Sequence, residues 1–256
     1  MLETIRHDDI LELRLARPPV NALNPDLVHA LRDAVENAPA TGARGIVLSG
    51  SPGLFSAGLD VPHLLQLERA AFRVFWNDFF GLCAALARSP IPVVAAITGH
   101  APAGGAVLSI TCDYRVMARS PDPDKPFRIG LNEVQVGLSV PECIQAVLRR
   151  LVGTHRAERL MVVGAMLDSA QAAAIGLVDE LVDVDSVVPR ARAWLAELLK
   201  LPPHALAQTR SLARADIAAL FADPAALPVE DFLDGWFAPE AQQVLHALVA
   251  RLKSKG

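Results

Sequence analysis

The chain has 256 residues, 52% of them hydrophobic, so it can bury a sizeable core and is not expected to be disordered. Its formal charge is −4, and its Lys and Arg residues form no cluster dense enough to follow a nucleic-acid backbone. Composition and charge therefore argue against a disordered chain and against a nucleic-acid-binding protein.

The three cysteines, Cys83, Cys112 and Cys143, are odd in number, widely spaced and set among apolar residues. This pattern argues against a disulfide framework and a zinc site, so we expect a reducing compartment and no bound metal. The first residues alternate as a pair of strands does, unlike a secretory signal, and no unbroken apolar run approaches the length that spans a bilayer. We expect a soluble, cytoplasmic protein without membrane contact.

Strand patterns and helix patterns alternate over the first 140 residues. Strands are indicated by two-residue periodicity or short buried apolar runs, and helices by apolar residues three or four apart. In chain order the pattern gives a strand beginning at residue 10, a helix in 25–38, a strand in 44–50, a helix in 62–88, a strand in 89–99 and a helix in 104–112. Strands separated by helices imply right-handed crossovers and a mainly parallel sheet covered on its faces. The predicted fold class is α/β.

Beyond residue 140 the pattern becomes mostly helical. Within 168–176, Asp168 or Ser169 can cap the start of a helix and Gly176 can take the left-handed closing position. After residues 201–206 two further helical runs reach the end of the chain, and we expect this tail to pack elsewhere, such as on a neighbouring subunit. The predicted organisation is a core in residues 1–200 and a helical C-terminal region in 201–256.

Two loops of small residues, "FSAGLD" at 55–60 and "HAPAGG" at 100–105, each follow a predicted strand and precede a predicted helix. The backbone N–H groups of Ala57 and Gly104 are little obstructed, and two such donors converging on one oxygen would form an oxyanion hole. The alternative is a pair of ordinary turns, in which Asp60 is simply the N-cap of the next helix. Ser56 lacks the sequence context of a nucleophile elbow, because Leu54 stands two residues before it.

A single carboxylate, Glu133, stands in the apolar stretch 127–140. If residues 129–133 are extended, Glu133 shares a face with Ile129 and Leu131, and such surroundings would raise its pKa toward that of a useful general base. The alternative is a solvated loop glutamate. His100 and Glu142 are further candidates for acid or base, although a loop histidine is often structural and Glu142 is well placed to begin a helix.

Taken in order, the motifs of the chain resemble those of the crotonase (enoyl-CoA hydratase/isomerase) superfamily, and within it the Δ3,Δ2-enoyl-CoA isomerase branch of the mitochondrial type. The resemblance covers nearly the whole chain and rests on "PPVNALN", "FSAGLD", "PAGG", "TCDYRVMA", "IGLNEVQVGL", the stretch 153–182 and the final "RLK". It implies a spiral of ββα units with a helical C-terminal region, assembled as trimers or dimers of trimers.

The resemblance also implies roles for particular residues. Ala57 and Gly104 would donate their N–H groups to the oxygen of an enoyl-CoA thioester, and Asn132 would frame the acyl chain. Glu133 matches the catalytic glutamate of the family. The segment that lines the CoA entrance would consist of Ala57, Gly58, Leu59 and Asp60.

One departure from the family pattern bears on the reaction. Hydratases of the family carry a second glutamate three residues after the glycine of the hole, and here that position is Val107. Water addition usually divides its proton transfers between two carboxylates, whereas one base suffices to move a double bond. Within the resemblance this departure favours an isomerase without cofactor, and the resemblance implies a place in fatty-acid β-oxidation. The alternatives are a hydratase that recruits Glu142 or His100 and a non-catalytic acyl-CoA-binding subunit.

A second departure lies in residues 119–128, which make a longer connection than the family pattern leads us to expect. The prolines in it predict a surface excursion, which would either extend a subunit contact or reshape the acyl tunnel.

Overall fold

The computed structural model describes residues 1–223 and 226–254, apart from the side chain of Lys253. Its larger sheet has six strands, which are, in spatial order, β1 (Leu2–His7), β2 (Ile10–Leu15), β3 (Gly45–Ser49), β5 (Val93–Ile97), β7 (Tyr114–Arg119) and β10 (Glu180–Asp183). Only the β1–β2 pair is antiparallel, and every other neighbouring pair is parallel. The predicted α/β class and mainly parallel sheet are confirmed.

A second, smaller sheet holds β4 (Gly53–Leu54), β6 (Gly99–Pro102), β8 (Arg128–Gly130) and β9 (Leu167–Asp168). Strands β4, β6 and β8 are parallel to one another, and β9 pairs with β8 in the antiparallel direction. These strands are too short to show a period in the sequence, and no two-residue periodicity predicted them.

The chain winds as a spiral in which each turn supplies one strand to each sheet and then a helical segment. The first turn is β3, β4, α2 (Val61–Leu64) and α3 (Arg69–Arg88), and the second is β5, β6 and α4 (Gly104–Ile110). The third is β7, β8, the 3-10 helix η2 (Glu133–Val136) and α5 (Glu142–Val152). The expected spiral of ββα units is confirmed.

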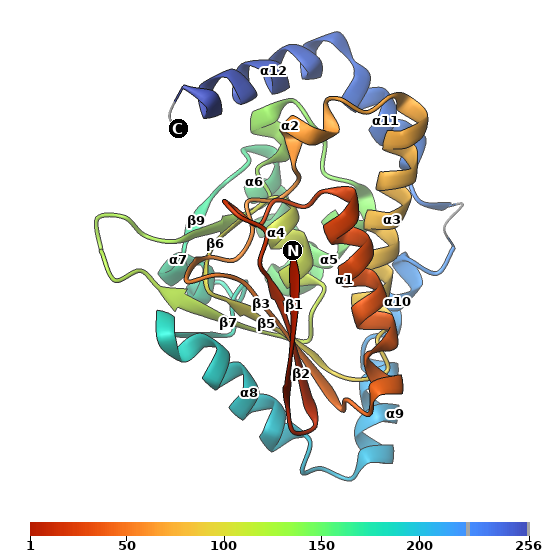
Figure 1. Cartoon of the computed structure of the whole chain (residues 1–256), viewed down its shortest axis with the longest axis vertical. Helices are drawn as coiled ribbons and strands as arrows, with labels where there is room; N and C mark the ends of the chain where they lie inside the picture. The colour runs from red at the N-terminus through yellow and green to blue at the C-terminus, as the bar shows by residue number, and fades with distance from the viewer. Residues whose placement is uncertain (224–225, 255–256) are drawn as a thin grey trace.

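Helices cover the larger sheet on its two faces. α1 (Pro25–Asn37) begins where the Asn24 side chain accepts the Leu27 N–H at 3.0 Å, and it packs against α3. α8 (Val187–Leu198) lies along β3, β5 and β7 on the other side (Figure 1). The core is apolar, and Phe72 and Phe80 of α3 are fully buried in it.

Two predictions about the helices need correction. The predicted helix 62–88 is broken at residues 65–68 because α2 ends at Leu64 and α3 begins at Arg69, although apolar spacing continues across the break. Mostly helical structure beyond residue 140 holds for α5, α6 (Thr154–Val162), α7 (Ser169–Ala174) and α8, but β9 and β10 interrupt it. The caps of α7 are as predicted, since Asp168 accepts the Gln171 N–H and Gly176 has φ of 78°. Two further short segments are the 3-10 helices η1 (Ala38–Thr41) and η3 (Val184–Ser186).

Two helical runs were predicted for the C-terminal region, and its described residues, 201–223 and 226–254, form four α-helices: α9 (Pro203–Ala213), α10 (Ala215–Leu220), α11 (Val229–Phe237) and α12 (Pro239–Lys253). α10 and α11 pack on α3, and α12 passes above α2 in the view of Figure 1. α12 contacts both α2 and η2. The region therefore packs at least in part on its own chain. The end of the predicted region, residues 255–256, lies outside the described residues, and a contact with a neighbouring subunit stays a prediction.

Two further features can be placed. The connection that includes residues 120–127 projects from the side of the molecule (Figure 1), with most of its residues exposed or half-buried, as expected of a surface excursion.

Among the described helices, α3 is long and apolar enough to cross a membrane by length and composition, and half of its apolar window is buried inside the protein.

Candidate active site

Three loops that carry the predicted site residues follow three neighbouring strands of the smaller sheet. Residues 55–60 follow β4, Ala103 and Gly104 follow β6, and Asn132 and Glu133 come shortly after β8. Because β4, β6 and β8 are parallel and paired side by side, their carboxyl ends meet at one edge. The fold thus gathers residues that are far apart in the sequence.

The first two loops touch each other through glycines. A Cβ atom on Gly58 would lie 3.1 Å from the Gly104 nitrogen, and one on Gly104 would lie 3.4 Å from the Leu59 nitrogen. Gly58 also has φ of 82°, which side-chain-bearing residues rarely adopt. Glycine at both positions therefore lets the backbones approach and leaves the Gly104 amide uncovered.

The hydrogen bonds of the loops decide which amides are available, and they correct the prediction for Ala57. The Ala57 N–H donates to the Val20 carbonyl at 3.0 Å, the Gly58 N–H to Ser56 Oγ at 3.1 Å, and the Asp60 N–H to the Leu23 carbonyl at 3.0 Å. Within residues 1–223 and 226–254, the Leu59 N–H has no acceptor, and neither has the Gly104 N–H in the first turn of α4. The two free neighbouring amides are those of Leu59 and Gly104.

Sequence reasoning did not single out Leu59 as a donor because all residues of the loop carry the same backbone group. The choice between them depends on pairing with Val20 and Leu23, which precede α1 and lie far away in the chain. Ala57 and Leu59 both line the cavity described next, whereas Gly58 does not.

Glu133 begins the 3-10 helix η2, so the expectation that residues 129–133 are extended is wrong beyond Gly130. The expected rise in the pKa of Glu133 nevertheless holds. Glu133 Oε2 is buried and has no hydrogen-bond partner among the described residues. Burial raises the pKa of Glu133 to about 7, while a hydrogen bond from its own backbone acts in the opposite direction.

Glu133 lines a cavity of about 520 Å³, and Leu59 and Gly104 line the same cavity. Asn132 also lines it, with a buried Oδ1 that has no partner among the described residues. Val107 of α4, 3% exposed, lines the same cavity and supplies no polar atom to it.

Most of the cavity wall is apolar and comes from distant parts of the chain. It includes Trp76 and Phe79 of α3, Phe232 of α11, and Leu248 and Leu252 of α12. Trp76 and Phe232 stack with ring centroids 3.8 Å apart. These residues and Arg17 are members of the site that the motifs did not identify, because apolar residues on a helix look the same whether they face a core or a cavity.

Other candidates from the sequence lie outside this cavity. Ser56 is fully buried and donates from Oγ to the Asn21 carbonyl at 2.8 Å. The Glu142 side chain is 69% exposed and pairs with Arg149. The His100 ring accepts the Arg128 N–H through Nδ1 at 3.2 Å, and burial, aided by Arg128, lowers its pKa. None of the described residues 119–128 lines the cavity, so this connection does not shape it.

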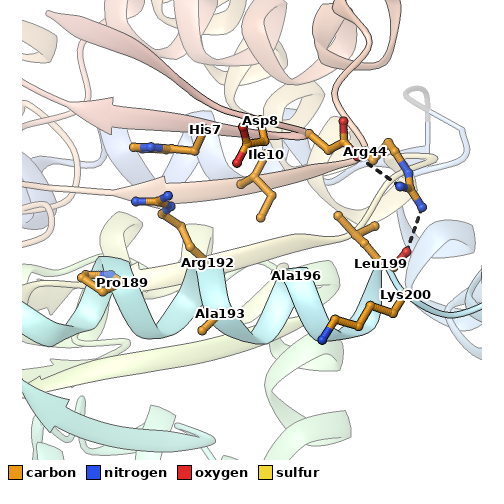
Figure 2. A pocket seen from close by; sticks show the side chains of 11 residues that line it. His7, Asp8, Ile10, Arg44, Pro189, Arg192, Ala193, Ala196, Leu199 and Lys200 are labelled. Atoms are coloured by element: carbon orange, nitrogen blue, oxygen red, sulfur yellow. Dashed lines mark hydrogen bonds and ion pairs between the residues drawn. The ribbon is translucent and has the colours of Figure 1, made fainter.

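A second cavity, of about 550 Å³, lies between the β1–β2 turn and α8. Figure 2 shows Arg192 extending from α8 toward the strand that carries His7, and Arg44 bonded to the Leu199 carbonyl. Neither Glu133 nor the two free amides line this cavity. Among the described residues, no group of three or more His, Cys, Asp or Glu side chains is arranged to hold a metal ion.

Comparison with known proteins places the chain in a family. Residues 6–230 match the family described as enoyl-CoA hydratase/isomerase. The chain belongs to the enoyl-CoA hydratase/isomerase family. The crotonase resemblance and fold expected from the motifs are thereby confirmed.

Relatives within the family carry two kinds of name. The chain is 31% identical over 245 residues to human mitochondrial enoyl-CoA delta isomerase 1, covering 95% of this chain and 80% of that protein. A crystal structure of human mitochondrial Δ3-Δ2-enoyl-CoA isomerase superimposes with a TM-score of 0.91 at 29% identity, covering 99% of this chain and 98% of that chain. A probable enoyl-CoA hydratase of Mycobacterium avium is 34% identical over 218 residues, covering 84% of this chain and 80% of that protein. The chain is thus a member of an enzyme family that comprises enoyl-CoA isomerases and hydratases.

Proposed function

We propose that this protein is a Δ3,Δ2-enoyl-CoA isomerase, which moves the double bond of a 3-enoyl-CoA to the 2-trans position. One observation carries the proposal. Within the described residues that line the cavity beside the Leu59 and Gly104 amides, Glu133 is the acid with a buried carboxylate oxygen, Oε2, that has no partner. Val107 occupies the position where a second acid would serve hydration.

Glu133 acts as the proton shuttle. Its carboxylate removes a proton from C2, and the electron pair of the broken C2–H bond moves into the thioester to give a dienolate. Protonated Glu133 then returns the proton to C4, so that the C3=C4 bond is replaced by C2=C3 and no atom is gained or lost. A pKa of about 7 suits both half-reactions, because the same group must be base and then acid.

The dienolate oxygen receives hydrogen bonds from the Leu59 and Gly104 N–H groups. Donors that are fixed before the reaction stabilise the developing charge without reorganisation, and removing one such donor typically costs on the order of 100- to 1000-fold in rate. Ala57, Leu59 and Asp60 line the approach for the CoA thioester, with Gly58 behind them, and Asn132 borders the acyl chain. The apolar wall excludes water from the intermediate.

Several further properties belong to this proposal. The reaction uses no metal or redox cofactor, since the thioester supplies the acidifying carbonyl and Glu133 supplies the base. We further propose that the enzyme serves fatty-acid β-oxidation in the cytoplasm and assembles as a homotrimer or a dimer of trimers, as the family resemblance implies.

The test uses 3-hexenoyl-CoA with the wild type, Glu133→Gln and the control Glu142→Gln, which changes an exposed acid outside the cavity. We expect turnover to fall at least about 1000-fold in Glu133→Gln and to stay near the wild-type value in Glu142→Gln. In heavy water, deuterium should enter C2 and C4 only in turnovers in which the Glu133 proton exchanges with solvent before it is returned, so partial labelling is the expected result. Near-normal turnover by Glu133→Gln would refute the role of this residue.

Assays on the same purified protein distinguish the alternative functions. Faster addition of water to a 2-enoyl-CoA than isomerisation of the 3-enoyl-CoA would make the protein a hydratase, as some relatives are named. Saturable binding of both thioesters without turnover would make it a non-catalytic acyl-CoA-binding subunit.

A further inference from the structure

An ion pair lies at the wall of the cavity beside the free amides. Arg17 Nη2 donates to Asp60 Oδ2 at 2.6 Å, and both residues line the cavity with Glu133. The Asp60 side chain is 11% exposed and that of Arg17 is 23% exposed. Asp60 directly follows Leu59 in the chain. A carboxylate therefore lies one residue away from the backbone N–H that is proposed to bind the negatively charged thioester oxygen.

The position of this carboxylate is fixed by the fold. Asp60 Oδ1 accepts the His63 N–H at 3.1 Å and so caps α2, while the Asp60 N–H bonds to the Leu23 carbonyl at 3.0 Å. These bonds hold the loop in the conformation that leaves the Leu59 N–H free. The acid is therefore useful as a cap, but its charge opposes the formation of a second negative charge nearby.

Arg17 is held in place by bonds of its own. Its Nη1 donates to the Ala22 carbonyl at 3.1 Å, and its backbone N–H donates to Asn21 Oδ1 at 2.9 Å. Among the described residues that line the cavity, the ionisable groups are Arg17, Asp60 and Glu133. His63 of α2 meets Asp60 through its backbone N–H, and its ring is not among the groups bonded to Asp60.

We propose that Arg17 is a positioning residue that cancels the charge of Asp60 and thereby allows negative charge to develop on the thioester oxygen at the Leu59 and Gly104 amides. Arg17 acts through Asp60 and does not contact the reacting atoms. The inference rests on the proposed function, because it concerns the dienolate of that reaction. In a partly buried site, one uncompensated charge that lines the same cavity is a large perturbation of such an intermediate.

The experiment is a double-mutant cycle on 3-hexenoyl-CoA turnover. Arg17→Gln should lower kcat about 10- to 100-fold with a smaller change in KM, because it leaves the Asp60 carboxylate unpaired. Arg17→Lys should recover part of this loss, since it restores the charge without the fork of the guanidinium. Arg17→Gln combined with Asp60→Asn should recover most of it, because Asn removes the charge and still caps α2.

The matched control is Arg190→Gln, which breaks an ion pair of the same length, 2.6 Å to Glu180, outside the cavity. It should leave turnover near the wild-type value. Thermal unfolding of every variant identifies any loss of folded protein. Failure of the double variant to recover kcat, or an effect of Arg17→Gln on KM alone, would overturn the proposal and indicate that Arg17 contacts the substrate directly.

A spectroscopic readout separates this inference from the proposed reaction. Acetoacetyl-CoA forms an enolate with its own near-ultraviolet absorption band, and a site that favours negative charge on the thioester oxygen should raise the bound enolate fraction. We expect that fraction to fall in Arg17→Gln and to return in the double variant. If the wild type fails to isomerise 3-hexenoyl-CoA but shows this pattern, the proposed function fails and the role of Arg17 stands. An unchanged enolate fraction refutes the role of Arg17 even if isomerisation is observed.

Discussion

At the scale of single residues, the site depends on groups whose hydrogen bonds are missing. Glu133 Oε2, the Leu59 N–H and the Gly104 N–H all lack partners within the described part of the chain. Unsatisfied polar groups in a buried place cost free energy, and natural proteins rarely keep them without a use. Their presence around one cavity is consistent with groups held ready for a ligand that supplies the missing partners.

The pKa of Glu133 gives a prediction for the pH dependence of catalysis. Burial raises this pKa from 4.5 to about 7, and only the ionised carboxylate can take a proton from C2. We expect kcat/KM for 3-hexenoyl-CoA to fall about tenfold for each pH unit below 7 and to level off above it. A rate that stays constant down to pH 5 would contradict the assignment, and measuring with a second substrate of different chain length controls for binding effects.

At the scale of elements, the site depends on where the ends of three strands lie and not on how long these strands are. β4, β6 and β8 have two to four residues each, yet their parallel pairing sets the positions of the two amides and of η2. The loops fit together only because no side chain separates Gly58 from Gly104.

A glycine pair tests this requirement. Gly58→Ala places a Cβ 3.1 Å from the Gly104 nitrogen at φ of 82°, whereas Gly153→Ala also introduces a Cβ at a positive φ, of 83°, but with nothing within 4 Å. Both changes should lower the free energy of unfolding by roughly 1–3 kcal/mol, through the positive φ and, in Gly58→Ala, through the close contact as well. Only Gly58→Ala should also lower turnover, by about 100-fold, since it covers one proposed donor. Equal activity of the two variants would show that the Gly104 amide is not used.

At the scale of the whole molecule, the cavity is completed by helices that end the chain. α11 and α12 supply Phe232, Leu248 and Leu252, and α12 also touches the end of η2, where a Cβ on Gly137 would meet Ala241 at 3.2 Å. The helices that lead to them are tied to the larger sheet through Asp113. Arg210 of α9 donates to both carboxylate oxygens of Asp113, at 2.7 and 2.8 Å.

This tie predicts a stability difference between two arginines. Arg210 and Asp113 have side chains 11% and 12% exposed, so Arg210→Ala leaves a buried charge underpaired and should lower the free energy of unfolding by about 3 kcal/mol. Arg150→Ala breaks a pair to Asp216 that is 36% and 60% exposed and should cost less than about 1 kcal/mol. Urea unfolding curves measure both. Equal losses would mean that the Asp113 contact does not anchor the C-terminal helices.

By itself the sequence determined the α/β class, through the buried strands around residues 46 and 94, and the identity of Glu133 as the isolated acid in an apolar stretch. The motifs also indicated the family. These features depend on local composition and order, which the chain carries directly. Sequence patterns did not detect strands as short as β4 and β8, because two or three residues show no period.

The tertiary structure alone decided which amide beside Gly104 is free, that Glu133 lies on a 3-10 helix, and that α11 and α12 close the cavity. It also brought Arg17 to Asp60, 43 residues apart in the chain. Each of these features depends on a partner that is distant in the sequence. The sequence alone does not distinguish one backbone N–H, or one apolar helix residue, from another.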